Sequence, residues 1–74
     1  MNEETFNLSI RKFLKKAGVG SQREIEHAVE AARRSGAIAD DASLPVRMTL
    51  EMPDLRLNVT FDGEIRLGGE ADPD

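Results

Sequence analysis

The sequence has no cysteine, tryptophan or tyrosine, and it contains only three prolines and three phenylalanines among 74 residues. A chain without cysteine forms neither a disulfide nor a cysteine-ligated zinc site, which fits a reducing compartment. The sequence also lacks an apolar run near the roughly 18 residues that span a bilayer. Its acidic, polar start, Met-Asn-Glu-Glu, is unlike a secretory signal. We therefore expect a cytoplasmic protein that does not partner a membrane.

The net charge is negative, and the charged residues are unevenly placed along the chain. The net charge is -4 and the isoelectric point is about 4.9, which disfavours nonspecific attraction to nucleic acid. Residues 1–36 hold seven basic and five acidic side chains, a net of +2, whereas residues 37–74 hold three basic and nine acidic ones, a net of -6. The sequence thus predicts a mildly basic first half and an acidic second half.

The first half has the apolar spacing of amphipathic helices. A helix is predicted over residues 3–17, with Asn2 as its N-cap. Gly18 is suited to end that helix, and Ser21 with Glu24 matches a capping box that starts a second helix over residues 22–35. Gly36 is the expected stop of the second helix. The apolar positions are Phe6, Ile10, Phe13, Leu14 and Ala17 in the first helix, and Ile25, Ala28, Val29 and Ala32 in the second.

The second half alternates apolar and polar residues, as in strands with one buried face. Residues 37–45 are predicted to form a surface connection, followed by strands at 46–52, 55–61 and 65–67. A four-residue loop around Pro53 and Asp54 would pair Leu50 with Leu57 and Met48 with Val59. A second, bulged turn with a left-handed Gly63 would keep the apolar residues of the third strand on the same face.

These elements predict an α+β fold of order ααβββ. Two antiparallel helices would pack on one face of a three-stranded antiparallel meander, with the strand at 55–61 in the centre. Residues 1–67 would form one domain, and residues 68–74 a disordered acidic tail. The expected core consists of Phe6, Ile10, Phe13, Leu14, Ile25, Val29, Val46, Met48, Leu50, Leu57, Val59 and Ile65.

Catalytic and metal-binding patterns are weak. His27 is the single histidine and lies within a turn of Arg23 and Glu30. A general base also needs a substrate pocket, so we expect a solvated surface histidine. Asp40 and Asp41 lack the spacing of a calcium loop, and no phosphate-cradling loop is present. We therefore expect no enzymatic activity, no cofactor, no metal and no small-molecule site.

The turn between the two predicted helices resembles that of a helix-turn-helix, in which the second helix reads the major groove. Against this interpretation, Gly20 lengthens the turn and Leu14 stands where a small residue is usual. Glutamates on the second helix, such as Glu26 and Glu30, would also repel phosphate. Under this alternative the nucleic-acid contacts would be Lys12, Lys15, Lys16, Gln22, Arg23 and Arg34.

The first strand is predicted to lie at an edge of the sheet without a lysine or an internal proline to protect it. Such an edge can pair with a second copy or with a strand of a partner. The residues expected at this partner edge are Arg47, Thr49 and Glu51.

The opening residues 1–16, MNEETFNLSIRKFLKK, together with residues 21–26, SQREIE, resemble a family of short, uncharacterised bacterial proteins that form a domain of unknown function. The resemblance extends to about Leu67 and is most specific in the first 30 residues, and the acidic tail departs from it. It implies a bacterial origin but no activity, cofactor or site residue. The function is thus unknown. We expect a small non-enzymatic interaction module, as a homodimer or with a protein partner, and the alternative is a divergent helix-turn-helix-like nucleic-acid binder.

Overall fold

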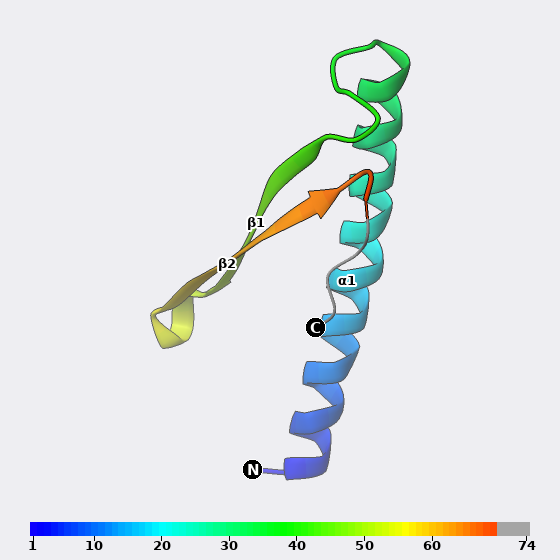
Figure 1. The fold of residues 1–74 in the computed structure, drawn as a ribbon. Coiled ribbons are helices and arrows are strands. Elements are labelled where there is room, and N and C mark those ends of the chain that lie inside the picture. Colours follow the sequence, from blue (N-terminus) through cyan, green and yellow to red (C-terminus); the bar gives the residue numbers. More distant parts are fainter. Residues whose placement is uncertain (70–74) are drawn as a thin grey trace. The chain divides into compact units, whose positions relative to one another are not determined.

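A computed structural model describes residues 1–69 of the chain, which contain one long helix and one β-hairpin (Figure 1). The elements in chain order are α1 (Glu3–Arg34), β1 (Ser43–Met52), the short 3-10 helix η1 (Pro53–Leu55) and β2 (Leu57–Arg66). The chain divides into two compact units, Met1–Ala37 and Ile38–Asp74. The structure is α+β in general. The predicted disorder of the tail falls largely on residues 70–74, which lie outside the described residues.

Both ends of α1 form the structures that the sequence predicts for them. The Asn2 side-chain oxygen accepts a hydrogen bond of 3.0 Å from the backbone N–H of Thr5, which confirms Asn2 as the N-cap. At the other end Gly36 has a φ of +73°. Its backbone N–H bonds to the carbonyl of Arg33, and that of Ala37 bonds to the carbonyl of Ala32. This pair of bonds is a Schellman motif, for which a left-handed glycine is the usual residue.

The prediction of two antiparallel helices is wrong, because α1 runs through residues 17–22 without interruption. Gly18 and Gly20 are both part of the helix and have no positive φ. Each glycine costs the helix about 1 kcal/mol relative to alanine. Continuing the helix preserves its backbone hydrogen bonds and keeps the apolar positions of both halves in phase. The signals at Gly18 and Ser21 permit a helix end but do not impose one.

The second unit is a two-stranded antiparallel hairpin in which all ten residues of β1 pair with β2. Pro53 opens the four-residue connection, and Arg56 closes it with a φ of +52°, in the left-handed region. The pairing brings apolar residues together on one face, with Leu50 opposite Val59 and Met48 opposite Phe61. The predicted alternation of an apolar and a polar face is confirmed.

The predicted three-stranded meander is wrong, because residues 57–66 form one unbroken strand. Asp62 and Gly63 do not turn the chain. They pair with Arg47 and Val46 of β1 instead. The loop lies one residue later than predicted, so the register moves by two residues and Leu50 pairs with Val59 rather than Leu57. Because β2 continues through residues 62–66, residues 43–46 also have partners in it, and β1 begins at Ser43 rather than at Val46.

The predicted core does not form within the described residues, where no side chain is fully buried. Of the expected core, the residues in the first half of α1 are exposed, as are Met48 and Val59. The others are half-buried: Ile25, Val29, Val46, Leu50, Leu57 and Ile65. One helix and one hairpin each have an apolar side, and neither unit has a second layer of its own to cover it.

Candidate interaction surfaces

The continuous helix joins the two predicted sets of apolar residues into one surface, which we call the apolar stripe. Successive residues of a helix are about 100° apart, so Ala17, Ser21 and Ile25, at spacings of four, follow one side of α1. Ser21 thus links the two halves of the stripe. The stripe consists of Phe6, Ile10, Phe13, Leu14, Ala17, Ile25, Ala28, Val29 and Ala32. Sequence reasoning missed this continuity, although the unbroken spacing from Ala17 to Ile25 was a signal for it.

The two halves of the apolar stripe differ in size and exposure. In the N-terminal half the large side chains of Phe6, Phe13 and Leu14 are 49%, 54% and 58% exposed. In the C-terminal half Ile25 and Val29 are half-buried. The most extensive uncovered apolar surface of α1 therefore lies in its first four turns.

The opposite side of α1 is basic and polar, and it holds the basic residues of the nucleic-acid alternative. By helical periodicity Lys12, Lys15, Lys16, Arg23 and Arg34 face away from the apolar stripe, whereas Gln22 lies at its margin, about 20° around the helix from Val29. Residues 11–23 include five basic side chains and no acidic one. The Arg34 guanidinium lies 3.3 Å from the Glu30 carboxylate, in an exposed pair one helical turn apart. Because residues 17–22 are helical, the turn that a helix-turn-helix requires is missing.

The hairpin has one apolar and one polar face. Large side chains remain exposed on the apolar face, among them Met48, Val59 and Phe61. Phe61, the last residue of the predicted strand 55–61, lies instead within β2 opposite Met48 and is 59% exposed. Cross-strand pairs order the polar face. The Arg47 guanidinium lies 2.6 Å from the Asp62 carboxylate, and the Ser43 hydroxyl donates to the Glu64 carboxylate.

Both strands of the hairpin have an unpaired edge among the described residues, since the sheet has two strands. The predicted partner edge is on β1, where Arg47 pairs with Asp62, Thr49 lies opposite Thr60 and Glu51 lies opposite Asn58. The strand at 55–61 was expected in the centre of the sheet. Its position at an edge is a consequence of the missing third strand.

His27 is exposed on α1. Within residues 1–69 no three or more His, Cys, Asp or Glu side chains gather where they could hold a metal ion. In the same residues, no helix combines the length and the apolar character that crossing a membrane requires.

Comparison with known proteins identifies a family but no function. The sequence model of a family of unknown function, DUF6494, matches residues 1–68, so the chain belongs to this family. No curated protein and no solved structure matches the chain.

Proposed function

We propose that this member of DUF6494 is a non-enzymatic protein-interaction module, and that another protein chain covers its apolar faces. The observation that supports this proposal is the lack of any fully buried side chain in residues 1–69, where Phe13 and Phe61 are more than half exposed. Large contiguous apolar surfaces on a folded protein mark places where other molecules bind.

The energetics of the two units favour the same conclusion. Ordering a residue costs about 1.5 kcal/mol of conformational free energy, which burial of apolar surface has to offset. A two-stranded hairpin is marginally stable on its own, and a helix draws most of its stability from packing of its apolar side. Both units therefore gain stability when a further chain covers their apolar faces.

Dependence of folding on association tests the proposal. We would record far-UV circular dichroism melts and sedimentation equilibrium of the full chain over a hundredfold range of concentration. A chain ordered by association melts at higher temperature as its concentration rises. Leu14→Ser on the apolar stripe should lower the melting temperature. Leu8→Ser is the matched control, because Leu8 is similarly exposed (55%) but lies on the opposite side of α1.

Two outcomes separate the interpretations. A monomer that melts cooperatively at a temperature independent of concentration would overturn the proposal, since its apolar faces would then be covered within one chain. A chain that stays monomeric and poorly ordered at every concentration would still require a partner, although not a second copy of itself.

The proposal includes a bacterial cytoplasmic setting, which cell fractionation of the tagged full chain in its host would test. Contact with nucleic acid is the second candidate, favoured by the five basic and no acidic side chains of residues 11–23. Fluorescence anisotropy with duplex DNA at about 50 and 200 mM salt distinguishes the two, because phosphate contacts weaken steeply with salt. Saturable, salt-sensitive binding that Lys12→Gln and Lys16→Gln reduce would favour this candidate.

A further inference from the structure

We infer that the occupant of the apolar stripe is the stripe of a second copy of this chain, with the two α1 helices antiparallel. This inference rests on the proposed interaction function and names its partner. Three properties of α1 support it: the spacing of the stripe, the unequal size of its two halves, and the charges at its ends.

The spacing keeps the apolar stripe on one side along the whole of α1. Its positions follow intervals of four, four and three, which repeat every 11 residues, or 3.67 residues per turn. This value is close to the 3.6 of a straight α-helix, so the stripe hardly drifts around the axis. The positions in this repeat are 6, 10 and 14, then 17, 21 and 25, then 28 and 32. Two such helices can therefore remain in contact along their length.

The size gradient favours the antiparallel orientation. Large side chains such as Phe6 and Ile10 lie in the first half of the stripe, and small ones such as Ala28 and Ala32 lie in the second. Packing large residues against small ones fills the space between helices evenly. An antiparallel pair in which facing residue numbers add up to 38 achieves this at its two ends, where Phe6 faces Ala32 and Ile10 faces Ala28. Towards the middle, Phe13 faces Ile25, and the small residues Ala17 and Ser21 face each other.

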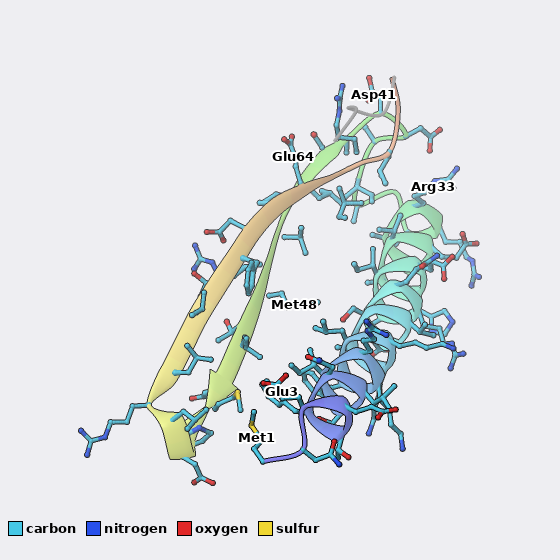
Figure 2. The ribbon with its side chains drawn as sticks, turned by 90° about the horizontal axis from the view of Figure 1, so that it is seen from below. Met1, Glu3, Arg33, Asp41, Met48 and Glu64 are labelled. Carbon is cyan, nitrogen blue, oxygen red and sulfur yellow. The ribbon has the colours of Figure 1, made fainter. Side chains whose placement is uncertain are left out.

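The charges at the helix ends favour the same orientation. Glu3 and Glu4 lie in the first turn of α1 and Arg33 and Arg34 in the last, and Figure 2 shows Glu3 and Arg33 at opposite ends. In an antiparallel pair the acidic end of each helix lies beside the basic end of the other. The two helix dipoles are then antiparallel, which is the favourable arrangement. A parallel pair would place like charges together at both ends.

Spin-label distances test the orientation, and the absence of cysteine allows single labels without background. Thr5→Cys and Gln22→Cys place labels near one end and near the middle of α1, the first on the side away from the stripe and the second at its margin. In the antiparallel register the two Thr5 positions are about 40 Å apart along the axis and the two Gln22 positions about 9 Å apart. We expect a long distance for the first label and a short one for the second. Short distances for both labels would show a parallel pair and overturn the inference.

A residue exchange tests the register in the full chain. Ile10→Ala and Ala28→Ile should each weaken dimerisation about tenfold, the first by leaving a cavity and the second by overpacking. The double variant exchanges the two facing side chains and should recover most of the lost affinity. Additive losses in the double variant would overturn the register.

Sedimentation equilibrium separates this inference from the function on which it rests. A monomer that is poorly ordered at every concentration overturns the homodimer but leaves an interaction module with a different partner. A cooperatively folded monomer overturns both. A dimer that tolerates Leu14→Ser without loss of affinity would locate the contact outside the apolar stripe and overturn the inference alone.

Discussion

The helix and the hairpin use opposite kinds of contact. In α1 every backbone hydrogen bond joins residues close in sequence, and the caps at Asn2 and Gly36 come from residues next to the helix ends. In the hairpin each residue of β1 depends on a partner 5 to 23 positions away, from Met52 with Leu57 to Ser43 with Arg66. The local hydrogen bonds of a helix can continue past a residue of low helix propensity. The pairing of two strands depends instead on where the chain turns between them.

This difference explains which interruptions each unit tolerates. The helix passes through Gly18 and Gly20 because the next turn restores the same hydrogen-bond pattern. In the hairpin, Pro53 and a left-handed Arg56 set the turn and thereby the register of all ten pairs. Three predictions test this comparison.

The largest effect is expected from breaking the helix where two helices were first predicted. Val19→Pro removes a backbone hydrogen bond and clashes with the preceding turn, at a cost of about 3 kcal/mol in a helix interior. We expect far-UV circular dichroism to show a marked loss of helix content. Glu3→Pro is the control, because the first helical position tolerates proline and Asn2 already has the extended backbone that precedes one. A Val19→Pro chain with unchanged helix content would indicate a natural break there.

A smaller effect with opposite signs is expected at two glycines. Gly18→Ala should raise the free energy of unfolding by up to about 1 kcal/mol, since Gly18 is helical and a Cβ there meets nothing within 4 Å. Gly36→Ala should lower it by a similar amount, because Gly36 has a φ of +73°. Thermal or denaturant unfolding measures both changes. Destabilisation by Gly18→Ala would mean that Gly18 ends a helix after all.

The smallest effect concerns the hairpin register. Arg47 and Asp62 form an exposed ion pair, with side chains 68% and 62% accessible, so their coupling should be about 0.2–1 kcal/mol. A double-mutant cycle with Arg47→Ala and Asp62→Ala measures it. Thr49 and Thr60, opposite each other in this register, should show a cross-strand contact between their backbone protons in nuclear magnetic resonance. Zero coupling without that contact would favour a turn at Asp62.

Sequence reasoning succeeded where one residue type has one strong local role. It identified Asn2 as an N-cap and Gly36 as a helix stop, since their roles depend only on the adjacent turn. It also identified which residues of the hairpin share a face, because alternation needs no knowledge of the partner strand. The candidate surfaces follow from these features, and the residues of the apolar stripe were all recognised.

Sequence reasoning failed at two places, where a local signal for a helix end or a turn competed with the spacing or the strand pairing of a longer segment. Gly18 and Ser21 match helix ends, but the phase of the apolar residues over nine turns favours continuity. Asp62-Gly63 matches a hairpin turn, but pairing with Arg47 and Val46 extends β2 through it. In both places one long helix or strand replaces two predicted short ones, because the long element forms more backbone hydrogen bonds.

The amino-acid pattern alone was sufficient for the α+β class, the outer limits of the helix and the two-faced character of the strands. Those properties arise from capping, periodicity and side-chain alternation within a few residues. Only the folded structure decided the number of helices and strands among residues 1–69, the strand register, and the lack of fully buried side chains within either described unit. They depend on the total hydrogen bonding and burial of whole elements, which no short window of sequence contains.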